Sequence, residues 1–223
     1  MAIGHLLLTA ALALPLPGSP TIPIDPLGIV TEANDAHLSN GSVSTGTTIY
    51  DGDRLSTEGT GTLRVRSGSA MIYLAGASQV TLRSVPEGAK GTAADLTAGT
   101  LVFSSALATA VEIRADEASI RPATDAPTVG QIVVVGPKKL YISARRGSLI
   151  FSYHDESEVI SQGQSYRVVL DPPDDDPAAK PDVDHPGRKP ARRRKGFLFF
   201  LIGIAVAPII YRGLEPSESP YRP

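Results

Sequence analysis

The chain has 223 residues, a formal net charge of −2 and a sequence pI near 6.1. This balance provides no global positive field for gathering nucleic acid, so we expect no nucleic-acid partner. The absence of cysteine excludes a disulfide framework, a thiol nucleophile and a thiolate metal site, and the scarcity of aromatic residues predicts a largely aliphatic core.

The first twenty residues resemble a signal segment. The apolar run from Leu6 to Leu14 has the length of a signal-peptide core, and the proline-rich stretch from Pro15 to Pro20 would break a helix. Residues 1–5 contain no Lys or Arg, and the nearest small-x-small site is Ala11-Leu12-Ala13. We interpret 1–20 as an export signal, with an uncleaved anchor and a cytoplasmic terminus as the alternatives. Residues 21–45 form an entry segment with one strand near 27–33.

Residues 46–170 repeat short alternating apolar runs closed by glycine turns. Leu63 and Val65 fall on one face of such a run, with Arg64 and Arg66 on the other. The pattern predicts an all-β domain of many short strands, arranged as a two-sheet sandwich or a β-solenoid-like stack. Spacing alone does not choose between them.

Three local predictions follow within this region. Runs 54–56 and 61–66 are read as separate strands, as are 93–96 and 100–104. The non-alternating run 132–135 predicts a central strand covered on both faces. The one place where a short helix is expected is 85–88.

A tight turn is expected at Asp51-Gly52-Asp53. Glycine supplies a positive φ there, and the two carboxylates can accept hydrogen bonds from backbone amides. Two neighbouring carboxylates are too few oxygen ligands for calcium.

No constellation for catalysis is evident in the sequence. The four histidines, His5, His37, His154 and His185, lack ligand-like spacing and are read as surface residues. There is no Gly-x-Ser-x-Gly elbow, no phosphate loop and no dinucleotide turn. We therefore predict that the protein is not an enzyme and has no catalytic residue, no cofactor, no cofactor-binding residue and no metal ligand.

The character of the chain changes after Leu170. An acidic, proline-rich linker (171–187) leads to a polybasic flank (188–195) and then to sixteen uncharged residues (196–211), followed by a short tail (212–223). As a helix the sixteen residues would reach about 24 Å, and interfacial Tyr and basic side chains would extend the span. We expect one C-terminal transmembrane helix over 196–211, with Arg192, Arg193, Arg194 and Lys195 contacting lipid headgroups; a buried core helix is the alternative.

The membrane orientation is ambiguous. The positive-inside rule would place the polybasic flank, and with it the β domain, in the cytoplasm, whereas an export signal would place both outside. We expect the β domain to be periplasmic or otherwise extracytoplasmic.

The strand-turn order resembles the FecR-like domain. The likeness rests on the segments 50–57, 61–66, 68–74, 78–82, 96–101, 146–151 and 161–165, and it covers roughly 46–170. The resemblance implies an extracytoplasmic domain of the kind found in bacterial regulators of ferric-siderophore uptake. In those regulators the membrane helix precedes the β domain, whereas here the apolar segment follows it, so control of a sigma factor is not implied.

Three functional hypotheses remain. The leading one is a non-enzymatic, membrane-tethered β domain of the bacterial cell envelope that binds or senses an envelope protein or polysaccharide. The second is an envelope hydrolase with carboxylates gathered across strands. The third is a cytoplasmic tail-anchored interaction protein.

Overall fold

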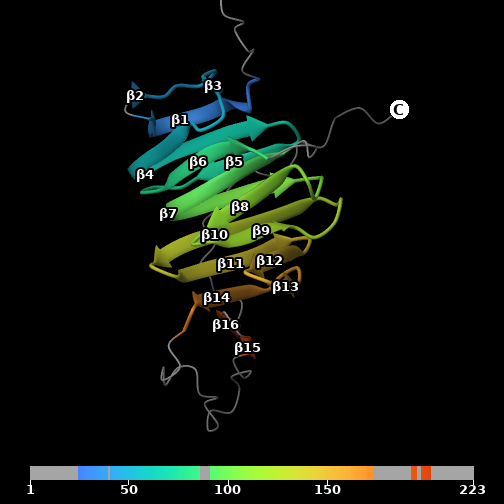
Figure 1. Ribbon diagram of the computed structural model, residues 1–223. Helices are drawn as coiled ribbons and strands as arrows, with labels where there is room; N and C mark the ends of the chain where they lie inside the picture. The colour runs from blue at the N-terminus through green and yellow to red at the C-terminus, as the bar shows by residue number, and fades with distance from the viewer. Residues whose placement is uncertain (1–24, 40, 86–90, 173–191, 195–196, 202–223) are drawn as a thin grey trace, which may run out of the picture.

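The computed structural model describes residues 25–39, 41–85, 91–172, 192–194 and 197–201. The sequence prediction of an all-β domain is confirmed, because these residues contain strands and no helix. The strands stack in a column from β2 and β3 at one end to β15 at the other (Figure 1). They are β1 (Gly28–Leu38), β2 (Gly41–Ser42), β3 (Thr48–Ile49), β4 (Arg54–Ser67), β5 (Ala70–Leu74), β6 (Gln79–Ser84), β7 (Thr92–Ser105), β8 (Val111–Ala115), β9 (Ala118–Pro122), β10 (Thr128–Gly136), β11 (Lys139–Arg146), β12 (Leu149–Tyr153), β13 (Glu156–Ile160), β14 (Ser165–Leu170), β15 (Arg192–Arg194) and β16 (Phe197–Leu201).

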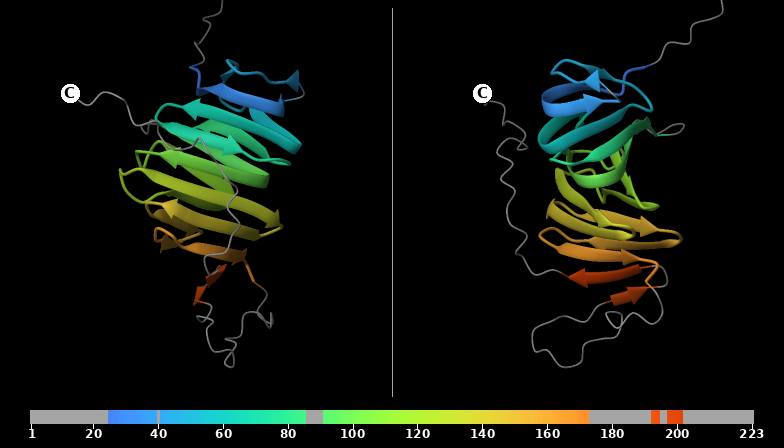
Figure 2. Two further views of the ribbon diagram at one scale, coloured as in Figure 1. Left: turned by 180° about the vertical axis from the view of Figure 1, so that it is seen from behind. Right: turned by 90° about the vertical axis from the view of Figure 1, so that its left-hand side faces the viewer.

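Three long strands divide the hydrogen-bonded ladder into two branches. The two halves of β1, β4 and β7 pair with different neighbours, so each strand takes part in both branches. Branch one runs β3-β1-β4-β5-β7-β10-β11-β14-β16-β15, and branch two runs β2-β1-β4-β6-β7-β8-β9-β12-β13. The pairing of β7 with β8 is parallel, and the other pairings are antiparallel. The branches face each other as two layers of a sandwich, and Figure 2 shows their stacking from two further sides.

The shared strands differ from the sequence prediction. Runs 54–56 and 61–66 are parts of one strand, β4, and runs 93–96 and 100–104 are parts of β7. Glycines permit both crossings: Gly99 has a φ of +81°, and a Cβ on Gly61 would lie 2.3 Å from the Asp35 carbonyl oxygen. The glycines that predict strand ends lie instead at bends within continuous strands.

Two buried hydroxyl groups form hydrogen bonds with backbone groups where β4 and β7 bend from one branch into the other. The Ser78 hydroxyl accepts a hydrogen bond from the Thr100 amide (2.8 Å) and donates one to the Thr100 carbonyl (3.0 Å). The Thr57 hydroxyl accepts from the Ser78 amide (3.0 Å) and donates to the Ala75 carbonyl (2.5 Å). Backbone groups that the bends remove from the ladders are thus paired inside the protein, where an unpaired group would be costly.

The core between the branches is aliphatic, as predicted. Leu63 and Val65 are almost wholly buried, whereas Arg64 and Arg66 lie on the outer face of the same strand. Further fully buried members include Ile49, Leu55, Leu74, Leu82, Leu101, Phe103 and Ile113.

The predicted burial of the run 132–135 needs correction. Strand β10 is central in its branch, as predicted, but Val135 is 47% exposed, so the strand is not covered on both faces at that end. Within the segment 196–211, for which a transmembrane helix is predicted, Phe197–Leu201 forms β16, and its phenylalanines pack into the open end of the sandwich; the helix stays a prediction. Residues 202–211 of that segment, the signal segment 1–20 and most of the expected helix at 85–88 lie outside the described residues. Within the described ranges there is no helix with the length and apolarity that a bilayer crossing requires.

We predict that Gly99→Ala lowers the free energy of unfolding by about 3 kcal/mol or more. A Cβ at this position would lie 2.4 Å from the Ser78 hydroxyl and 2.5 Å from the Ala77 carbonyl oxygen, and the positive φ adds strain. Urea denaturation of the full chain measures the change. Gly136→Ala is the matched control, because a Cβ there meets nothing within 4 Å. Equal denaturation midpoints for the two variants would contradict the role assigned to the bend.

Candidate functional site

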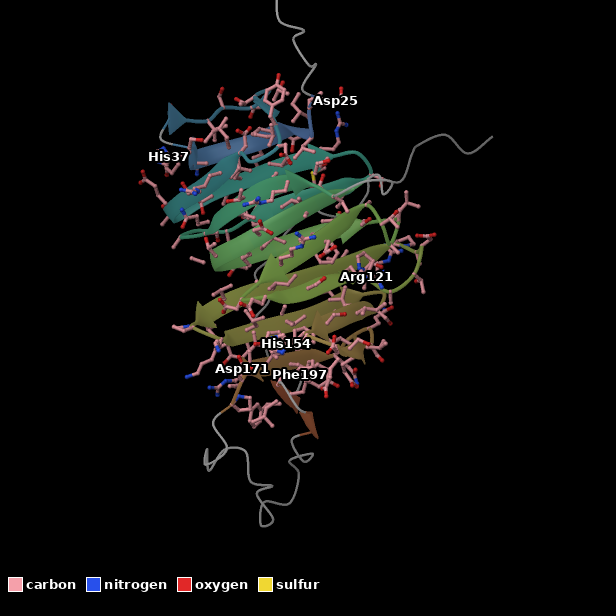
Figure 3. All side chains as sticks on the ribbon, in the orientation of Figure 1. Asp25, His37, Arg121, His154, Asp171 and Phe197 are labelled. Atoms are coloured by element: carbon pink, nitrogen blue, oxygen red, sulfur yellow. The ribbon has the colours of Figure 1, made fainter. Side chains whose placement is uncertain are left out.

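Polar side chains gather where three hairpin turns and the end of β14 meet. We call these residues the turn cluster: Asp116 and Glu117 between β8 and β9, Lys138 between β10 and β11, Tyr153 and His154 at the end of β12, and Asp171 after β14. All except Tyr153 have a positive φ, between 43° and 68°. Figure 3 labels two of them, His154 and Asp171. The cluster joins turns of branch two to turns of branch one.

Asp171 is the centre of the turn cluster. Its Oδ2 accepts hydrogen bonds from the Tyr153 hydroxyl (2.8 Å) and from the Lys138 ammonium (2.7 Å). The Lys138 backbone amide in turn donates to Asp116 Oδ2 (3.0 Å). The Leu170 amide also donates to the Lys138 carbonyl (2.9 Å), so the point where the chain leaves the sandwich is held by side chain and backbone together.

The hydrogen bonds of the turn cluster stabilise Asp171, Lys138 and Tyr153 in their least reactive ionisation states. Hydrogen bonds from Lys138 and then Tyr153 lower the pKa of Asp171, and the bond to Asp171 raises the pKa of Lys138. Burial, followed by the bond to Asp171, raises the pKa of Tyr153 to about 12. General acid-base or nucleophilic chemistry near neutrality needs shifts in the opposite directions. The arrangement therefore suits a structural latch better than a reaction centre.

His154 extends the cluster to its exposed side. Its ring stacks on Tyr153 with a centroid distance of 4.1 Å, and its Nε2 lies 3.7 Å from Glu117 Oε2. The two side chains are 58% and 80% exposed, so this contact is solvated and weak. The sequence reading of His154 as a surface residue in a hairpin turn is confirmed.

The predicted turn at Asp51-Gly52-Asp53 is also confirmed. Gly52 has a φ of +84°, Asp53 Oδ2 accepts from the Tyr50 amide (2.8 Å), and Asp51 Oδ1 accepts from the Ser84 amide (2.6 Å). Both carboxylates accept hydrogen bonds from backbone amides, Asp53 within the turn and Asp51 from β6.

The described histidines do not converge. His37 lies on β1, where its Nε2 is 3.0 Å from Glu58 Oε1, and His154 lies in the turn cluster; His5 and His185 are outside the described residues. Among the residues that the structure describes, no group of three or more His, Cys, Asp or Glu is placed to hold a metal ion.

The sequence does not indicate the turn cluster, because the members of the cluster are far apart in the chain. Lys138 follows Gly136-Pro137, and Asp171 precedes Pro172-Pro173, so each reads only as a turn or linker residue. Nothing in the sequence around Tyr153 indicates its partner. Lys138 and Asp171 meet because β11 pairs with β14, a pairing that no local signal specifies.

The outer faces of the two branches differ in chemistry. Branch two carries ion pairs between neighbouring strands or along one strand, Arg83 with Asp95 (2.7 Å) and Arg114 with Glu112 (2.8 Å). The outer face of branch one carries a cross-strand ion pair as well, Arg64 with Glu32 (3.2 Å), together with tyrosines. The Arg64 guanidinium lies 5.8 Å from the ring centroid of Tyr73.

Comparisons with known proteins yield only distant structural similarity. No family model matches the sequence, and no curated protein matches it. Two crystal structures, at 2.50 and 1.65 Å resolution, of a "putative anti-sigma factor" from Parabacteroides distasonis ATCC 8503 are similar to the chain with TM-scores of 0.44 and 0.42 and identities of 9% and 11%. Each match covers 52% of this chain and 54% of the other, so the chain spans about half the length of these structures.

We predict that Asp171→Asn lowers stability at neutral pH but not in strong acid. Because folding lowers the pKa of Asp171 below its ordinary value of 3.8, its contribution is present above that value and is lost as the pH falls through the folded-state pKa. Denaturant midpoints of the variant and the wild type should therefore differ at pH 7 and converge near pH 2. Asp155→Asn, an exposed change in the neighbouring turn, should leave the midpoint at pH 7 unchanged. A gap that persists at pH 2 would show that the carboxylate charge is not the cause.

We predict that Tyr153→Phe flattens the alkaline stability profile. Between pH 10 and 12 the unfolded tyrosine loses its proton while the folded one keeps it, so the wild type loses stability as the pH rises, on the order of 2 kcal/mol by pH 12. The variant lacks this term but also lacks the bond to Asp171, so it is less stable at pH 7 by about 1 kcal/mol. Chemical denaturation across this pH range measures both effects. Parallel profiles for the two proteins would contradict the burial of the phenol.

Proposed function

We propose that the protein is a non-enzymatic, membrane-tethered binding or sensing module of the bacterial cell envelope. The observation that carries this proposal is the turn cluster. Its carboxylate, ammonium and phenol are all stabilised in the ionisation states least suited to catalysis, and together they fix the point where the linker leaves the sandwich. A rigid domain on a linker can present a surface to a partner at a distance from the membrane.

The outer face of branch one is the better candidate for the binding surface. Tyr141 lies in register with Val133 on one side and Arg167 on the other, whereas Tyr73, under Arg64 on the same branch, is buried. Tyrosine and arginine are enriched at the energetic centres of interfaces. Ion pairs occur on both branches, so the exposed tyrosine is what distinguishes the branch-one face. We assign the partner, an envelope protein or an envelope polysaccharide, to the branch-one face.

The tether is assigned to the chain after residue 171. The linker 171–187 is acidic and proline-rich, and the flank with Arg192, Arg193, Arg194 and Lys195 adjoins the apolar segment 196–211. Basic residues next to an apolar segment favour anionic lipid headgroups. In this proposal the β domain is extracytoplasmic, nucleic acid is not a partner, and control of a sigma factor is not included.

We predict that a photo-crosslinking residue replacing Tyr141 forms adducts with an envelope protein or polysaccharide in intact cells. The same replacement at Arg121, an exposed position on branch two (Figure 3), is the matched control and should form few adducts. Protease added to spheroplasts should digest the domain without lysis. A domain that is digested only after lysis would contradict the proposed location, and equal adducts at 141 and 121 would contradict the assigned face.

A further inference from the structure

Strand β16 closes the open end of the sandwich with aromatic side chains. Phe197 and Phe199 are 0% and 5% exposed, and their rings stand edge-on to Phe151 of β12, with centroid distances of 5.0 and 5.1 Å. Tyr166 of β14 contacts Phe199 in the same way at 5.1 Å. Such edge-to-face pairs add to the free energy of burial. The closing strand therefore supplies the last layer of the core.

The place that β16 occupies is a strand-accepting edge. Five successive residues of β14, from Tyr166 to Leu170, pair with β16 in antiparallel register. Without β16, this edge would present unpaired backbone groups beside the exposed ring of Phe151. An edge of this kind binds an extended apolar segment by main-chain hydrogen bonds and side-chain burial.

Charges of opposite sign lie at the same open end. On β13, Glu156 and Glu158 are in register with Tyr153 and Phe151, so they occupy the inner face of branch two. On β15, positions 192 and 194 are in register with Phe199 and Phe197, the inner-facing residues of β16. Since β12 packs against β16, the next strands outward are β13 and β15, one acidic and one basic.

Docking of β16 and spanning of a membrane exclude each other. The apolar segment 196–211 has just enough length to approach a bilayer crossing. With Phe197–Leu201 held in the sandwich, the ten remaining residues would extend about 15 Å as a helix, half of the roughly 30 Å hydrocarbon core. The residues that close the sandwich are therefore needed by the membrane tether, and they cannot serve both at once.

We propose that β15 and β16, which we call the strap, exchange between the open end of the sandwich and an anionic membrane surface. In the closed state Phe197 and Phe199 complete the core, and in this proposal the acidic residues of β13 attract the basic residues of the strap. In the open state the phenylalanines enter the bilayer and the arginines contact anionic headgroups. The inference rests on the membrane tether of the proposed function and deepens it, because the tether becomes conditional on release of the strap.

A disulfide lock tests the exchange, and the absence of natural cysteine makes the lock specific. Arg167 and Phe200 are directly opposite on β14 and β16 and lie on the outer face, so Arg167→Cys with Phe200→Cys can form a cross-strand bond without altering the core. The full-length variant is mixed with vesicles of phosphatidylcholine containing phosphatidylserine, and flotation measures the bound fraction. We expect oxidation to weaken binding at least about tenfold relative to the same protein after reduction. Arg114→Cys with Ser119→Cys, a lock between β8 and β9, is the matched control and should have no effect.

A second variant tests the electrostatic part without changing the strap. Glu156→Gln with Glu158→Gln should raise the bound fraction about threefold, because the acidic strand no longer competes with the lipid for the basic one. Asp155→Asn, in the same turn, should not. Equal binding of the oxidised and reduced lock would overturn the exchange, as would binding by neither form or disulfide-linked dimers that place the strap of one copy in another. Failure in vesicles, combined with envelope adducts at position 141 in cells, would reject the exchange while leaving the binding module intact.

Discussion

The whole architecture depends on three strands that belong to two sheets at once. Because β1, β4 and β7 bend and continue, the branches cannot slide or separate without breaking backbone hydrogen bonds in both. The bend leaves backbone groups that the ladders cannot satisfy, and the hydroxyls of Ser78 and Thr57 pair with them inside the core. Gly99 is required at the same point, because its positive φ and the approach of the Ser78 loop leave no room for a Cβ.

The turn cluster connects the two branches near one end of the molecule, as the bends of the shared strands connect them at its centre. Both connect the two branches through polar groups that belong to distant parts of the chain. At the bends the groups are buried hydroxyls; at the turns they are a carboxylate, an ammonium and a phenol around Asp171. The buried hydroxyls and the buried phenol of Tyr153 would be costly to leave unpaired, whereas Lys138 and Asp171 are partly exposed and contribute less. The linker therefore leaves the sandwich at a defined place, and the strap closes the end next to it.

The sequence predicted the components of the sandwich well and their connections poorly. Alternation in 61–66 indicated which side chains enter the core, and the Asp51-Gly52-Asp53 turn was predicted down to the role of its carboxylates. The glycines near 59–61 and at 99 were read as ends of strands, since a glycine that bends a strand and one that ends it look alike. The hydropathy of 196–211 does not indicate that Phe197 and Phe199 have a partner in Phe151, so strand β16 could not be predicted.

By itself the sequence determined the class of structure, the aliphatic character of the core and the local turns, because these follow from the spacing of neighbouring residues. Only the tertiary structure decided which strands share both sheets, that Lys138 and Tyr153 meet at Asp171, and that β16 fills the open end. These features depend on pairings between residues distant in the chain, such as β11 with β14 and β14 with β16. Such pairings are selected by the free energy of burying the whole set of apolar side chains together, a quantity that no single stretch of sequence contains.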